Sequence, residues 1–147
     1  MIQPVSEFSP HAPWPLPQGV VDLFYQDAAS KRALEGELRG CFRAWSYDEL
    51  IPPSFEYADT LAAETGIQLA EEMYRFTDRD GRTLALRPDL TIPAARVAAT
   101  RLYDQPMPLR LFYVGSVFRY EAPQAGRQRE FTQAGIELIG AGTPAAD

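Results

Sequence analysis

The segment from Leu109 to Gly140 constrains the fold of this chain more than any other. It reads LRLFYVGSVFRYEAPQAGRQREFTQAGIELIG, with apolar residues on both sides of a polar centre. This pattern predicts two strands joined by a loop, and the loop carries Arg119, Arg127 and Arg129. Strands hold loop residues in fixed positions, and fixed arginines beside an aromatic ring suit a phosphate attached to a flat base. The hairpin is therefore the first candidate for a binding site.

The loop itself offers an anion site with an aromatic neighbour. Arg119 and Arg127 could each make charge-assisted contacts with an anion, worth roughly 1.5–3 kcal/mol per hydrogen bond. Phe131 could stack on a base, and Glu121 could hold an amine or a hydroxyl group or orient an arginine. A hairpin whose arginines are only paired at the surface explains the same residues equally well.

A second polar surface follows on the returning strand. Gln133, Gly135 and Glu137 occupy every second position, and a strand places such residues on one face. A glutamine, a gap and a carboxylate form a polar floor for a small ligand with an amino group. Asp89 and Thr91 stand at a strand-to-helix junction and could bind an ammonium group. Capping of the following helix by either residue explains that pair at least as well.

The N-terminal third of the chain predicts an extended arm and then a helix. Residues 1–19 are proline-rich and contain His11, the only histidine, which makes histidine-based catalysis improbable. Apolar residues at helical spacing predict a helix over 27–45 that packs on a sheet or a partner. Its apolar face is formed by Leu34, Leu38, Cys41, Phe42 and Trp45. Cys41 is therefore expected in the core. A single cysteine also indicates a reducing, cytoplasmic setting.

The middle of the chain predicts a hairpin and two further helices. Strands over 73–76 and 83–86 are joined by a segment with an Asp-Gly pair, which is a strong hairpin-turn signal. A short helix is expected over 58–63. Thr91 is the expected N-cap of a longer helix, which ends before Pro106.

The charge distribution narrows the class of partner. The net charge is −6, yet residues 73–129 carry a net +5 inside an acidic chain. Overall acidity argues against a broad nucleic-acid surface. No apolar run is long enough to cross a membrane, and no Cys/His cluster suggests a metal site.

Three strings, in this order, resemble a known family: WSYDELIPPSFEY, MYRFTDRDGRTLALRPDLT and VFRYEAPQAGRQREFTQAGIELIG. They are similar to the first motif, the amino-acid-binding turn and the second motif of class II histidine–tRNA ligase and of its paralogue, the regulatory subunit of ATP phosphoribosyltransferase. The resemblance covers most of the chain. It implies an α+β fold, with a mixed, mainly antiparallel sheet flanked by helices, as part of a class II aminoacyl-tRNA synthetase-like core.

The resemblance also implies roles for individual residues. It implies nucleotide or phosphate binding by Arg119, Glu121, Arg127 and Phe131. It implies histidine binding by Asp89, Thr91, Gln133 and Glu137. No catalytic residue and no metal ligand is expected, and the possible ligands are histidine and ATP or a related nucleotide.

Two positions separate the branches of the family. The ligase usually has Glu-Gly where this chain has Asp89 and Leu90, and a histidine or similar residue where this chain has Thr132. The resemblance therefore implies a regulatory, non-catalytic subunit that senses histidine. It would act with a short-form catalytic subunit in the first step of histidine biosynthesis. The alternatives are histidine–tRNA ligase, which would bind tRNA, and a structural dimerisation fragment.

The extent of the resemblance sets expectations for domains and assembly. The first motif implies a homodimer interface. The third motif and the last strands of the family's sheet do not follow the second motif here. Residues 20–147 are therefore expected to be the N-terminal part of a synthetase-like domain that follows the arm at 1–19. A sheet edge left unpaired would need cover from a dimer or from another segment.

Overall fold

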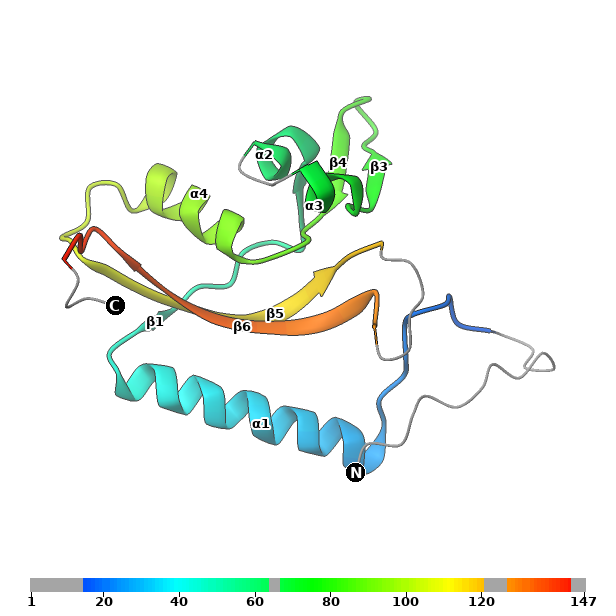
Figure 1. The fold of residues 1–147 in the computed structure, drawn as a ribbon, viewed down its shortest axis with the longest axis horizontal. Coiled ribbons are helices and arrows are strands. Elements are labelled where there is room, and N and C mark those ends of the chain that lie inside the picture. The colour runs from blue at the N-terminus through cyan, green and yellow to red at the C-terminus, as the bar shows by residue number, and fades with distance from the viewer. Residues whose placement is uncertain (1–14, 64–66, 121–126, 144–147) are drawn as a thin grey trace.

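A computed structural model describes residues 15–63, 67–120 and 127–143 of the chain. Its strands form two three-stranded sheets, ordered β1-β5-β6 and β2-β4-β3 (Figure 1). The elements are α1 (Tyr25–Ala44), β1 (Asp48–Glu49), β2 (Phe55–Tyr57), α2 (Ala58–Ala62), α3 (Ile67–Glu71), β3 (Arg75–Thr77), β4 (Thr83–Leu86), α4 (Thr91–Arg101), β5 (Leu109–Phe118) and β6 (Glu130–Ile139). The predicted α+β class is confirmed, with the strands divided between two sheets.

The long hairpin of β5 and β6 is the central structural element of the molecule. The two strands pair antiparallel along their whole length, from Leu109 opposite Ile139 to Phe118 opposite Glu130. The short β1 pairs parallel with β5, so the sheet is mixed. Figure 1 shows α4 on one face of this hairpin and α1 on the other. The predicted hairpin is confirmed, and its two faces have different environments.

The apolar core between the hairpin and α4 lies on one face of the hairpin. Odd-numbered residues of β5 point there because successive side chains of a strand alternate between faces. Tyr113 and Val117 pack with Leu90 and Ala94, and all four are buried. A neighbouring cluster joins β5 to the rest of α4, through Ala98, Leu109 and Leu111. The start of α4 is thereby fixed over the middle of the hairpin.

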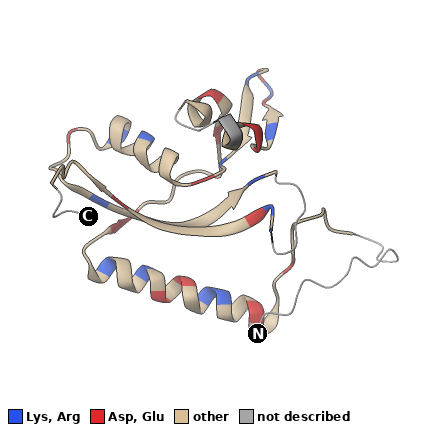
Figure 2. Cartoon of the chain, viewed as in Figure 1, with Lys and Arg blue, Asp and Glu red and all other residues tan. Residues whose placement is uncertain are grey.

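The other face packs against α1 with a mixture of apolar and charged contacts. Phe42 meets the fully buried Phe112 of β5, with ring centroids 5.3 Å apart. Glu35 is buried, and its carboxylate bonds Lys31, Arg32 and Arg39. The hydrogen bond from Lys31 and then that from Arg32 lower the pKa of Glu35, against a burial effect that raises it. Both signs of charge run along the helix in Figure 2.

The predicted core position of Cys41 is wrong, because its side chain is exposed. Leu34 and Trp45, from the same predicted face, are also exposed, by 58% and 70%. Phe42, from the same predicted face, does pack on the sheet, so the prediction is correct for one edge of that face. The side of the helix towards the sheet also carries Arg39, which bonds both the Glu49 carboxylate and the Val114 carbonyl oxygen. These polar contacts accompany Phe42 at the sheet, where the prediction had placed Cys41.

The second sheet has one covered face and one exposed face. Its Ala85 is fully buried beneath α2, with Leu61 and Met73. On the opposite face, Phe55 and Phe76 are exposed by 52% and 41%, with ring centroids 5.8 Å apart. The predicted hairpin of β3 and β4 is confirmed.

Candidate functional site

The polar floor predicted on β6 lies beneath the start of α4. The Oε1 atom of Gln133 accepts a hydrogen bond of 2.9 Å from the backbone N–H of Leu90. An Oδ1 atom of Asp89 accepts one of 3.2 Å from the N–H of Ile92. A strand side chain and an aspartate therefore hold the first turn of the helix, where N–H groups lack helical partners.

The predicted N-cap at Thr91 is wrong. The helix has Leu90 at its N-cap and Thr91 as its first residue. Asp89, the other capping residue considered from sequence, supplies the carboxylate. This difference releases the Thr91 hydroxyl, which lies 3.0 Å from the phenol oxygen of Tyr113.

Tyr113 joins Thr91 to Glu137. Its hydroxyl donates a 3.0 Å hydrogen bond to Oε1 of Glu137. Burial raises the pKa of the phenol to about 12; the bond from Thr91 opposes this rise, and Glu137 adds to it. Sequence reasoning placed Tyr113 only among the apolar residues of β5. The phenol bonds to two predicted site residues, so Asp89, Thr91, Gln133 and Glu137 all gather at one end of α4.

The residues predicted to bind a nucleotide lie further along the hairpin, towards its loop. The Nε–H of Arg119 donates to the Pro88 carbonyl oxygen at 2.8 Å. Its guanidinium carbon lies 5.3 Å from the centroid of the Phe131 ring, which is itself half-buried. Arg127 is exposed on the segment that enters β6. Glu121 lies outside the described residues. Among the predicted nucleotide-binding residues that the structure describes, Arg119 and Phe131 contact each other.

The third arginine of the hairpin anchors the backbone. The N–H of Arg129 donates to the Gly19 carbonyl oxygen at 2.6 Å, and the Arg129 carbonyl accepts from Arg119 N–H at 2.9 Å. Its guanidinium carbon lies 4.3 Å from the centroid of the Tyr120 ring. Arg129 thus ties the segment before α1 to the ends of both hairpin strands.

Arg87 is a buried cation between the two sheets that sequence reasoning did not single out as buried. It is 6% exposed. Its Nε–H donates to Ser116 O at 2.8 Å, and Nη1 donates to the carbonyl oxygens of Pro52 and Pro53 at 2.5 and 3.1 Å. Burial lowers its pKa, against an opposing effect of Glu56. No sequence pattern marks such a residue, because its acceptors are main-chain oxygens.

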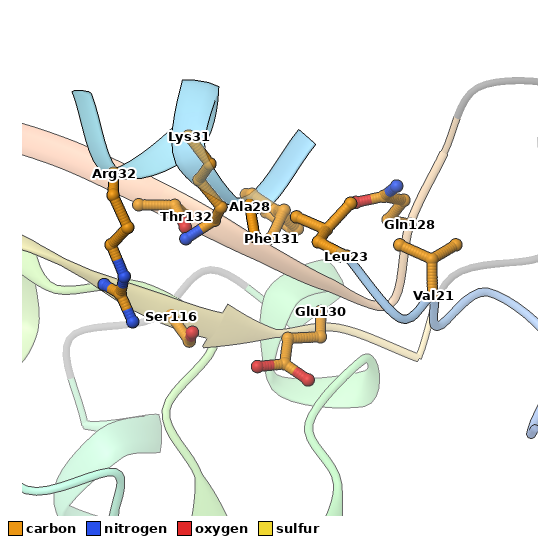
Figure 3. Close-up of a pocket in the computed structure, with 10 residues that line it drawn as sticks. All are labelled: Val21, Leu23, Ala28, Lys31, Arg32, Ser116, Gln128, Glu130, Phe131 and Thr132. Atoms are coloured by element: carbon orange, nitrogen blue, oxygen red, sulfur yellow. The ribbon is translucent and has the colours of Figure 1, made fainter. Parts of the chain in front are cut away.

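A hollow of about 340 Å³ lies on the other face of the hairpin, beside the start of α1 (Figure 3). It is lined by Val21, Leu23, Ala28, Lys31, Arg32, Ser116, Gln128, Glu130, Phe131 and Thr132. In Figure 3, Lys31 and Arg32 extend from the helix over the strands. Both also bond Glu35, which partly satisfies their charge. Gln133 of the polar floor faces α4, so the hollow is separate from the predicted histidine-binding residues, although Phe131 of the predicted nucleotide-binding group lines it.

The described part of the chain shows neither a cluster of metal ligands nor a membrane-spanning helix. No three His, Cys, Asp or Glu side chains within the described ranges converge as metal ligands would. None of the helices in the described part of the chain combines the length and hydropathy needed to cross a bilayer.

Comparison with known proteins identifies relatives over nearly the whole chain. A family model described as histidyl-tRNA synthetase matches residues 19–147. The ATP phosphoribosyltransferase regulatory subunit of Moorella thermoacetica is 53% identical over 135 residues, which are 92% of this chain and 35% of that protein. The histidine–tRNA ligase of Methanosarcina acetivorans is 44% identical over 131 residues, 89% of this chain and 32% of that protein.

Solved structures agree with the sequence relatives. A crystal structure from Bacillus halodurans, described as an ATP phosphoribosyltransferase regulatory subunit/histidyl-tRNA synthetase, has a TM-score of 0.78 and 36% identity. The match covers 89% of this chain and 33% of that chain. The chain thus spans about a third of the length of the relatives that it matches.

Proposed function

The chain belongs to the histidyl-tRNA synthetase family, and from this membership we propose that it is part of a regulatory, non-catalytic subunit of ATP phosphoribosyltransferase. The subunit acts in the first step of histidine biosynthesis and senses histidine. The observation that carries the proposal is the meeting of Gln133 with the start of α4, beside Thr91 and Glu137. This arrangement offers oxygen acceptors to a small ligand with N–H groups.

Relatives favour the regulatory branch over the ligase branch. Six regulatory subunits, including that of Moorella thermoacetica, are 40–53% identical to the chain and three of them reach 48% or more, against 44% and 42% for two ligases. Asp89, Leu90 and Thr132 also favour the regulatory branch, because the ligase usually has other residues at these positions. Histidine–tRNA ligase remains the second candidate, because its amino-acid pocket would need the same polar floor.

We assign ligand groups to the two ends of the site. Asp89, Thr91, Gln133 and Glu137 bind histidine. Arg119, Glu121, Arg127 and Phe131 bind ATP or a related anion, with the Arg119 guanidinium beside the aromatic ring. Occupation of the histidine end changes the contacts of the subunit with a short-form catalytic subunit, since a ligand shifts an equilibrium by its differential affinity for the two states.

The experiment that tests this function is histidine-dependent exchange between ATP and pyrophosphate. We expect the full-length protein to show none, because a regulatory subunit forms no adenylate. An authentic histidine–tRNA ligase, assayed in parallel, shows that the conditions support exchange. Clear exchange by the full-length protein would identify it as the ligase and exclude the regulatory function.

The proposed assembly is a cytoplasmic homodimer that binds the catalytic subunit. Residues 20–147 form the N-terminal part of its synthetase-like domain, preceded by the arm at 1–19. The dimer uses the first-motif region, where Ile51 is 83% exposed and Phe55 and Phe76 form an exposed aromatic pair. Large exposed apolar residues on one sheet face mark such contacts.

Replacing Phe55 and Phe76 together by aspartate is expected to dissociate the full-length dimer. Two carboxylates would have to be buried where two apolar rings meet, and we expect the dimer Kd to rise at least about tenfold. Sedimentation velocity over a concentration series measures this change. Tyr103→Asp, at another exposed aromatic residue, serves as the control and leaves the dimer intact. A double variant that dimerises like wild type places the interface elsewhere.

A further inference from the structure

The hydrogen bonds around Tyr113 have a single direction. The phenol donates its only proton to Oε1 of Glu137. The Thr91 hydroxyl, 3.0 Å away, must then donate its proton to the phenol oxygen. A phenol whose pKa is raised to about 12 keeps its proton under physiological conditions. The order is therefore Thr91 to Tyr113 to Glu137.

Gly135 makes this arrangement possible. It lies directly opposite Tyr113 in the hairpin. A Cβ atom at Gly135 would lie 2.7 Å from the phenol oxygen and 2.8 Å from two ring carbons. The tyrosine ring therefore lies over the glycine and reaches across β6. The φ angle of Gly135 is not positive, so other residues could adopt its backbone conformation. Glycine is needed here because a side chain would collide with the Tyr113 ring.

The direction of these bonds decides what the pocket can offer a ligand. Thr91 has its proton engaged, so only its lone pairs remain for a ligand. Glu137 has Oε1 engaged, which fixes the carboxylate and leaves Oε2 as an acceptor. Asp89 uses Oδ1 at the helix start and likewise retains a second acceptor oxygen. Three side chains at the start of α4 thus present acceptors, which suit a positively charged N–H donor.

We propose that Tyr113 is a positioning residue that holds Thr91 and Glu137 as acceptors, so that the group of side chains at the start of α4 selects ligands carrying an ammonium group. This inference rests on the proposed function for the identity of the ligand, but not for its charge. It adds two residues, Tyr113 and Gly135, to those that determine specificity. Neither need touch the ligand, because both act through the hydroxyl of Thr91 and the carboxylate of Glu137.

The test compares ligands with and without an ammonium group on the full-length protein. Histidine and histamine carry one, whereas imidazolepropionate keeps the ring and carboxylate but lacks it. By isothermal titration calorimetry, wild type should prefer histidine to imidazolepropionate. Tyr113→Phe keeps the ring over Gly135 and removes only the hydroxyl. We expect it to reduce that preference about tenfold, chiefly through weaker histidine binding.

Two substitutions of Thr91 test the preference for an ammonium group independently of Tyr113. Thr91→Ser keeps the hydroxyl and should keep the preference, whereas Thr91→Val should lose it. Tyr103→Phe, at an exposed tyrosine, controls for a general effect of losing a phenol. This pair decides the question even if the Tyr113 variant does not fold.

The outcomes separate this inference from the proposed function. If wild type prefers ammonium ligands and Tyr113→Phe or Thr91→Val retains the preference, the positioning role is wrong and the histidine site stands. If wild type ignores histidine but binds another ammonium-bearing amino acid, with a preference that Tyr113→Phe removes, the proposed function is wrong and the positioning role stands. If wild type shows no preference for an ammonium group, the inference is overturned.

Discussion

Replacing Arg87 by methionine is expected to lower the free energy of unfolding by about 3–5 kcal/mol. The guanidinium supplies three hydrogen bonds to main-chain oxygens of Ser116, Pro52 and Pro53. Methionine fills much of the same volume but leaves all three acceptors without this donor, and the bond to the Pro52 oxygen is the buried one. The loss would fall on the contact between β5 and the segment that leads to β2, so both sheets should be affected.

Urea-induced unfolding of the full-length protein, followed by circular dichroism, measures this effect. Arg101→Met is the matched control, since Arg101 is exposed at the end of α4 and its replacement should cost within about 0.5 kcal/mol. Arg87→Lys should fall between the two, because an ammonium group lacks the planar fork that reaches three carbonyls. Equal stabilities of the Arg87 and Arg101 methionine variants would show that the buried cation is not needed.

Replacing Gln133 by alanine is expected to abolish the stabilisation of the full-length protein by histidine. At a ligand concentration about a hundredfold above Kd, binding should stabilise the wild type by about 2.7 kcal/mol, seen as a rise in Tm. Alanine removes a side chain that we propose to contact the ligand. It also frees the N–H of Leu90, which Gln133 holds at 2.9 Å, so the first turn of α4 loses its support.

Two controls separate these effects. Gln105→Ala changes an exposed glutamine after α4 and should keep the full rise in Tm. Gln133→Glu keeps an oxygen acceptor for Leu90 N–H but removes the amide donor. Loss of the rise in both Gln133 variants would indicate direct contact with the ligand, whereas its recovery in Gln133→Glu would indicate support of the helix. A wild type with no rise at all would favour a purely structural fragment.

The sequence predicted the hairpin well because its signal is local and long. Each arm of ten residues is rich in apolar residues, and the segment between the arms is polar and carries arginines. The two-residue period of a strand correctly placed Gln133 and Glu137 on one face. It could not show that this face would lie beneath α4, since that depends on how Tyr113, Val117 and Ala94 pack.

The errors have physical causes that spacing does not encode. On α1, the side towards the sheet includes Phe42 but not Cys41, and Arg39 on that side bonds Glu49 of β1 and Val114 of β5. At α4, Thr91 has the composition of an N-cap, but its hydroxyl bonds Tyr113 and the cap position falls on Leu90. Each outcome depends on a partner distant in the sequence.

The sequence did not indicate the structural roles of two residues, Tyr113 and Arg87, although Arg87 stands close to Asp89 and Thr91 in the chain. Tyr113 reads as one apolar residue in a strand, and its polar role appears only when Gly135 is seen opposite. An aromatic residue paired with glycine across a strand ladder is a signal that could have been used. Arg87 offers no such signal, because all the acceptors of its side chain are backbone oxygens.

The most direct test of the proposed function is phosphoribosyl transfer to ATP by the short-form catalytic subunit, measured with and without the full-length protein while histidine is titrated. We predict that histidine inhibits the reaction only when the full-length protein is present, and that Gln133→Ala removes this inhibition. A rate and a histidine response that do not change when the full-length protein is added would contradict the proposal.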